Sequence, residues 1–220
     1  MSHFRKLTFA VIALAITLVT LSGASQAQSP QPLIPLSHPL APFLESRAYA
    51  AKMGATAEFS KMEWLAVDPV RKKLYVAMSE VSKGMSDDKG DIRVKENKCG
   101  IIYVADLDDT YDIKNLRPLI VGGPYDKTAE NPCSVDNIAN PDTLFVDPQG
   151  NLWIGEDTSN HVNNMIWRWD GKNLLRFATL PKGAEATGVI VTPANDLFFN
   201  IQHPSAMSVY PYNRGVIGVV

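Results

Sequence analysis

Apolar and polar positions follow a strand pattern from residue 59 of this 220-residue chain onward. Three segments, starting at Leu65, Leu144 and Val189, each carry an apolar run, an Asp-Pro or Thr-Pro pair, a polar turn and a second apolar run. Proline cannot donate to a strand ladder, so it ends the first strand. The polar residues that follow favour a chain reversal. Each segment therefore predicts an antiparallel hairpin.

Further apolar runs, at residues 99–109 and 116–123 after the first hairpin and at 165–180 after the second, predict units of four short antiparallel strands. Pro148 and Pro193, which end corresponding strands, are 45 residues apart, which is the period of a four-stranded propeller blade. The predicted fold is therefore all-β, a partial β-propeller of about two to three blades over residues 59–220. Propellers close with about four or more blades, so we expect a piece of a larger ring, self-association, a partner chain that completes the ring, or a shortened gene product.

The N-terminus has the pattern of a secretory signal. A basic start is followed by an apolar run over residues 7–21 and by small residues around Ala27, which predicts a signal peptide over residues 1–27 with cleavage after Ala27. The run is short for a bilayer span of about 20 residues, so we expect no stable membrane insertion after cleavage. This pattern predicts a periplasmic or extracellular protein. Residues 28–58 are expected to form an extended lead-in and one short helix within 40–53.

Composition narrows the possible partners. The net charge of −2 offers no footprint for nucleic acid. The charged insert at residues 82–98 is interpreted as a surface loop. Two cysteines, Cys99 and Cys133, are too few to define a disulfide framework, so a disulfide and two free thiols both remain open.

Acidic residues recur near the start of the first strand in each hairpin. Glu63 and Asp142 lie six residues before their prolines, and Glu185 lies two residues before the equivalent position. Alternate strand residues share a face, and the innermost strands of a propeller start at one end of its channel, where Asp157 is also expected. Converging carboxylates repel one another unless a cation lies among them or one is protonated. The pattern thus predicts a metal site for a hard ion such as Ca2+, although any single acid could be a turn former.

Three other residues are candidates for substrate binding. Lys61 lies two residues before Glu63 and is either a solvated charge or a group that binds an anion such as phosphate. Gln202 and His203 follow the second strand of the third hairpin and could bind substrate, ligate a metal or hydrogen-bond its ligands.

Three segments resemble the C-terminal part of PhoX-type alkaline phosphatases. They read KMEWLAVDPVRKKLYVAMSEVSKGM, NPDTLFVDPQGNLWIGEDT and GAEATGVIVTPANDLFFNIQHP, and the resemblance spans residues 43–220. It implies an exported Ca2+-dependent phosphatase with a propeller fold and a mixed calcium and Fe3+ cluster at the channel mouth. Glu63, Asp142 and Glu185 would be metal ligands, and Lys61 would contact phosphate. No segment matches the family's iron-binding cysteine motif, and Cys133 is not assigned that role.

The expected function is that of a secreted metal-dependent phosphoesterase that hydrolyses phosphate monoesters. One alternative is a non-catalytic calcium-binding propeller module that needs a partner chain. Another is a lactonase-type propeller hydrolase, since such enzymes also use channel acids on Ca2+.

Overall fold

The computed structural model describes residues 32–113 and 115–220. The chain divides into two compact units, with the boundary between Met53 and Gly54. The predicted signal peptide lies outside the described residues. Within the described part, no helix is both long enough and apolar enough to cross a membrane.

The first unit contains two short helices where the sequence predicts one. Helix α1 spans Ala41–Leu44 and helix α2 spans Ser46–Lys52. They are separated at Glu45, whose backbone is not helical and whose carboxylate accepts hydrogen bonds from the amides of Leu33 and Ile34. Glu45 therefore interrupts the helix and ties it to the extended lead-in.

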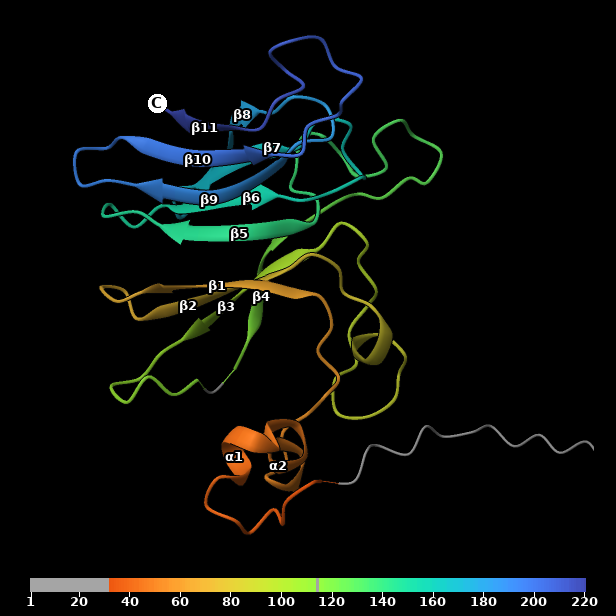
Figure 1. The fold of residues 1–220 in the computed structure, drawn as a ribbon, viewed down its shortest axis with the longest axis vertical. Helices are drawn as coiled ribbons and strands as arrows, with labels where there is room; N and C mark the ends of the chain where they lie inside the picture. Colours follow the sequence, from red (N-terminus) through yellow and green to blue (C-terminus); the bar gives the residue numbers. More distant parts are fainter. Residues whose placement is uncertain (1–31, 114) are drawn as a thin grey trace, which may run out of the picture. The chain divides into compact units, whose positions relative to one another are not determined.

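The second unit contains three antiparallel sheets, each with its strands in chain order (Figure 1). The first sheet comprises β1 (Met62–Asp68), β2 (Lys73–Met78), β3 (Ile101–Asp106) and β4 (Arg117–Val121). The second comprises β5 (Pro141–Val146), β6 (Leu152–Glu156), β7 (Met165–Trp169) and β8 (Leu174–Thr179). The third comprises β9 (Glu185–Val191), β10 (Leu197–Gln202) and β11 (Val216–Val219). These sheets are the blades of a partial propeller, which confirms the predicted fold class.

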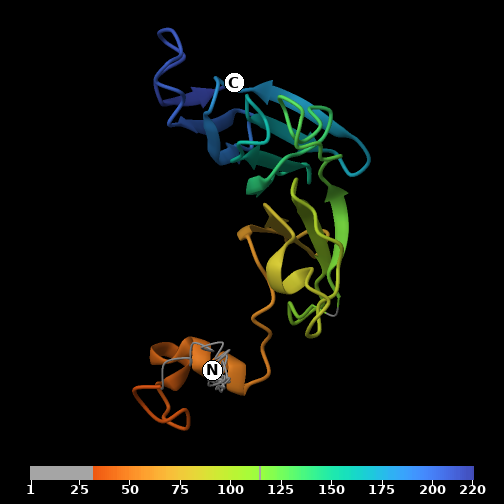
Figure 2. The same ribbon diagram turned by 90° about the vertical axis from the view of Figure 1, so that its right-hand side faces the viewer.

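The blades pack face to face, and β5 lies between β1 and β9 (Figures 1 and 2). One apolar cluster fills the space between the first and second blades, with Ile102, Ile154 and Trp167 among its buried members. A second cluster joins the second and third blades and includes Trp153 and Val189. Since alternate residues of a strand point to opposite faces, β6 contributes Ile154 to one cluster and Trp153 to the other.

The insert at residues 82–98 does more than cover the surface. It contains a short 3₁₀ helix, Lys83–Met85. Met85 is buried, and it packs with Val81 and Ile92 on the outer face of the first blade. The loop prediction missed this packing because the apolar residues of the insert are isolated among charges.

The repeated Asp-Pro and Thr-Pro pairs have a shared local role. The side chains of Asp68, Asp147 and Thr192 each accept hydrogen bonds from two amides of the following turn, at 2.8–3.2 Å. Short polar side chains that bond to the backbone two or more residues later stabilise turns. The residue before each proline thus holds the hairpin closed.

Asp147 has a further role in the core. Its carboxylate also accepts hydrogen bonds from the Asn151 side chain and from the indole N–H of Trp153, both at 2.8 Å. Burial raises the pKa of Asp147, but the hydrogen bonds from Asn151, Trp153 and the turn amides outweigh burial and hold the pKa below its ordinary value.

A disulfide joins Cys99, just before β3, to Cys133 in the loop between the first two blades. Both residues are fully buried, and they pack with Ala139 in a cluster of their own. The disulfide resolves the alternatives that the sequence left open.

Replacing Asp147 by Ala should lower the free energy of unfolding by about 2–3 kcal/mol, because the buried indole N–H of Trp153 loses its acceptor. The depressed pKa of Asp147 places its stabilising contribution above the unfolded pKa of about 4, and the contribution disappears as pH falls through the lower folded pKa. Urea unfolding at several pH values measures both effects. Asp170→Ala, which removes an exposed turn carboxylate, is the control and should cost less; equal losses would contradict this account.

Replacing both cysteines by Ser should destabilise the fold by about 3–4 kcal/mol, because the disulfide closes a chain segment with a sequence separation of 34. Thermal unfolding with and without reductant measures this. Reductant should lower the Tm of the wild type and leave the double variant unchanged. An unchanged wild-type Tm would argue against the disulfide.

Candidate functional site

Two of the predicted acids occupy equivalent β-bulges. The pairing between β1 and β2 shifts by one residue at Glu63, and the pairing between β5 and β6 shifts in the same way at Asp142. An extra residue in a strand redirects its side chain and is common beside functional sites. The shared spacing from proline therefore reflects a shared irregularity at the start of each inner strand.

The third acid lies at the corresponding end of the third blade. Glu185 is the first residue of β9 and pairs with Gln202, the last residue of β10. Its side chain is largely buried, and Oε2 lies 3.0 Å from Nε2 of His203. The structure thus brings together Glu185, Gln202 and His203, as the hairpin pattern predicts.

The four acids lie close enough to affect one another. Burial raises the pKa of Asp142, and the negative charges of Glu185, Asp157 and Glu63 raise it further, to about 6. Asp157 directly follows β6 and is exposed. Carboxylates from three neighbouring blades therefore share one region of negative potential.

Lys61 and Ser79 offset part of this charge at Glu63. The Lys61 ammonium lies 3.9 Å from Glu63 Oε1, and the Ser79 hydroxyl donates a hydrogen bond of 2.8 Å to the same oxygen. Half of the Lys61 side chain remains exposed. The lysine can therefore contact a ligand while it stays beside the acids.

The donor atoms of this cluster are of the type that Ca2+ prefers, because they are carboxylate oxygens. Across residues 32–113 and 115–220, no three His, Cys, Asp or Glu side chains are close enough together to hold one metal ion. An iron site with a cysteine ligand does not fit the described residues, because Cys99 and Cys133 are bonded to each other.

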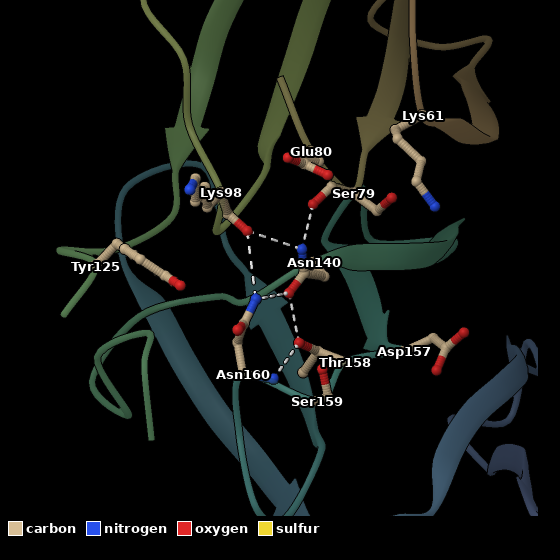
Figure 3. Close-up of a pocket in the computed structure, with 10 residues that line it drawn as sticks. All are labelled: Lys61, Ser79, Glu80, Lys98, Tyr125, Asn140, Asp157, Thr158, Ser159 and Asn160. Carbon is tan, nitrogen blue, oxygen red and sulfur yellow. Dashed lines mark hydrogen bonds between the residues drawn. The ribbon is translucent and has the colours of Figure 1, made fainter. Parts of the chain in front are cut away.

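A pocket of about 350 Å³ opens beside the acids (Figure 3). Lys61 and Asp157, both predicted site residues, line it. The remaining lining is also polar: Ser79, Glu80, Lys98, Tyr125, Asn140, Thr158, Ser159 and Asn160. A ligand held at the acids could extend into this pocket.

Asn140 joins the two blades that form the pocket. Its amide group donates to the carbonyls of Ser79 and Lys98 in the first blade. Its carbonyl oxygen accepts hydrogen bonds from Thr158 and Asn160 in the second blade. Figure 3 shows these bonds meeting at the centre of the pocket. All four bonds depend on one side chain, so Asn140 fixes the pocket walls relative to one another.

A buried pair, Glu156 and His161, supports the loop that carries Asp157. Glu156 accepts hydrogen bonds from the Ala139 and Met165 amides, the Trp167 indole and His161 Nδ1, at 2.7–2.9 Å. Burial lowers the pKa of His161, but the hydrogen bond and charge of Glu156 outweigh burial and raise the pKa. The contacts of the His161 ring with Glu156 and the Ser134 carbonyl anchor the loop to the core.

Sequence reasoning missed Asn140, Glu156 and Lys98. A signal for Glu156 was present, since strand periodicity places it on the same buried face as Leu152 and Ile154. Asn140 and Lys98 lie in loops whose contacts join distant segments, and no local pattern marks them.

The fold and site define a β-propeller protein with an acid-rich site where its inner strands begin. A family profile described as "Alkaline phosphatase PhoX" matches residues 41–205. The chain belongs to the PhoX alkaline phosphatase family. No similar sequence was found among the curated proteins.

One solved structure of a PhoX protein agrees with this family. Pseudomonas fluorescens PhoX, in complex with vanadate as a transition state analogue, is 25% identical with a TM-score of 0.62. The match covers 81% of this chain and 36% of that chain. A luciferin-regenerating enzyme is more distant, at 18% identity and a TM-score of 0.42, with 74% of this chain and 45% of that chain covered.

In the metal-free protein, Asp142→Asn should increase stability at pH 8 by about 2 kcal/mol, because it removes a repelled, partly buried charge. The raised pKa means that the protonated Asp142 favours folding below the unfolded pKa of about 4 and that this contribution is lost as pH rises through about 6. Urea unfolding between pH 4 and 8 with chelator present should show this dependence in the wild type and a weaker one in the variant. Parallel profiles would show that Asp142 is not repelled.

Proposed function

We propose that this chain provides a calcium site for hydrolysis of phosphate monoesters. One observation carries the proposal: the starts of β1, β5 and β9 bring Glu63, Asp142 and Glu185 to the same end of three adjacent blades. Membership of the PhoX family supports this chemistry. The match covers 36% of the P. fluorescens PhoX chain. Phosphatase activity is therefore proposed for this chain by analogy with that longer protein.

The proposed roles follow from position. Glu63, Asp142 and Glu185 would hold the ion after their side chains move closer together, since no three acids among the described residues now lie close enough to hold one ion. Asp157 would be a further oxygen donor. The bound ion would supply charge neutralisation at the phosphoryl oxygens. Fe3+ is not part of the proposal because both cysteines form the disulfide.

Lys61 and His203 are the proposed contacts for the phosphate. Lys61 is half-exposed beside Glu63 and can donate to a phosphoryl oxygen. His203 is mostly exposed, and its Nε2 faces Glu185, so it can orient that carboxylate or donate to substrate. Gln202, opposite Glu185 in the ladder, is the third candidate.

We also propose that the protein is exported, with residues 1–27 removed and residues 59–220 forming the propeller blades. The buried disulfide supports an oxidising compartment, since such bonds are rare in the cytosol. The periplasm or the extracellular space is the proposed location.

A non-catalytic calcium-binding module is the second candidate. One observation favours it: β1 leaves Trp64, Leu65 and Val67 between 45% and 61% exposed. Exposed apolar residues on an inner strand are suited to contact with another blade, supplied by a second copy or a partner chain.

p-Nitrophenyl phosphate hydrolysis at alkaline pH, with and without Ca2+, tests the proposed function. We expect turnover that requires Ca2+ and falls at least about tenfold in Glu185→Gln, because the amide removes a charged metal ligand. Glu130→Gln, which makes the same change at an exposed position, is the matched control and should retain activity. Calcium binding without turnover would favour the non-catalytic module, and Ca2+-independent turnover would contradict the proposed site.

A further inference from the structure

The pocket beside the acids contains a cationic side chain that the proposed phosphate site does not use. Lys98 lies on the opposite side of Asn140 from Lys61 and Asp157 (Figure 3). Its side chain is 45% exposed, with Nζ 4.0 Å from Glu96 Oε2. The same Nζ lies 5.4 Å from the centroid of the Tyr125 ring. The Lys98 ammonium is thus accessible beside Glu96 and Tyr125, at the end of the pocket away from Lys61 and Asp157.

The backbone around Lys98 is held in place while its ammonium remains accessible. The Lys98 carbonyl accepts hydrogen bonds from Asn140, at 2.9 Å, and from Asn160, at 3.4 Å. The next residue, Cys99, is joined by the disulfide to Cys133, which pairs with Tyr125. The pocket is therefore largely preformed, which reduces the entropic cost of binding.

The remaining lining favours a polar ligand. The hydroxyl groups of Tyr125 and Ser159 have no hydrogen-bond partner among the described residues, so both can bond to a ligand. A volume of about 350 Å³ lies near the lower end of the range of about 300–1,000 Å³ for small-molecule sites. A short carbon chain or a sugar-sized group fits this space.

We infer that the pocket binds the leaving group of the phosphomonoester and that Lys98 selects leaving groups that carry a second anion. The inference rests on the proposed function, because the acid cluster and Lys61 must hold the transferred phosphate. A carboxylate or second phosphate on a short polar skeleton would reach Lys98 from there. Glu80 and Asp157 in the pocket, and Glu96 beside Lys98, oppose an anion, so the expected preference is moderate.

The test is binding of two phosphonates that cannot be hydrolysed as esters, measured by calorimetry with the full protein in the presence of Ca2+. 4-Phosphonobutyrate carries a second anion, and butylphosphonate does not. The wild type should bind 4-phosphonobutyrate about five- to tenfold more tightly, as expected for one partly exposed charge-assisted contact. Lys98→Gln should bring the ratio of the two affinities close to one.

Lys172→Gln is the matched control, because it removes the same charge from an exposed turn outside the pocket. It should keep the wild-type ratio. An equal affinity of the wild type for both probes, a ratio that survives Lys98→Gln, or no binding of either probe would overturn the inference.

The two proposals fail in different ways. Ca2+-dependent turnover of p-nitrophenyl phosphate with equal phosphonate affinities would overturn the selection by Lys98 alone. A Lys98-dependent preference in a protein without turnover would retain the pocket assignment as a binding site and reject the phosphatase activity.

Discussion

The hydrogen bonds of the Asn140 side chain are the interactions on which the site most depends. It connects the ends of the first blade, through the carbonyls of Ser79 and Lys98, to the loop after β6, through Thr158 and Asn160. Apolar clusters hold the blades together, but dispersion and burial are non-directional. The four hydrogen bonds of Asn140 are directional, so they fix how the ends of the two blades are oriented. They thereby fix the walls of the polar pocket beside the acids.

Electrostatic repulsion is the cost of this arrangement. Asp142 lies among three other acids, and burial together with their negative charges raises its pKa. Lys61 and Ser79 offset the charge at Glu63, and His203 lies within hydrogen-bonding distance of Glu185. In the proposed function, a bound Ca2+ would neutralise these acids more strongly than the lysine, serine and histidine contacts do. The disulfide excludes both cysteines from metal binding and instead fixes the loop that carries Tyr125.

Local patterns in the sequence predicted much of this. The Asp-Pro and Thr-Pro hairpins allowed the blades to be predicted, because the turn residues act locally and the pattern repeats along the chain. The shared spacing also placed Glu63, Asp142 and Glu185 at one end, although the bulges behind that spacing were not foreseen. Asn140 and Lys98 could not be predicted, because several of their hydrogen bonds join segments 42–62 residues apart and no local period encodes such contacts. The division of the helix at Glu45 was missed for a similar reason, since the carboxylate bonds to the lead-in.

Calcium titration of four proteins tests the central claim, that strands from three blades build one metal site. The wild type would be compared with Glu63→Gln, Asp142→Asn and Glu185→Gln. The account predicts that each change weakens the same binding event, by about tenfold or more, because each removes one charged ligand. Loss of affinity in one variant only, or separate binding events for different acids, would contradict a shared site.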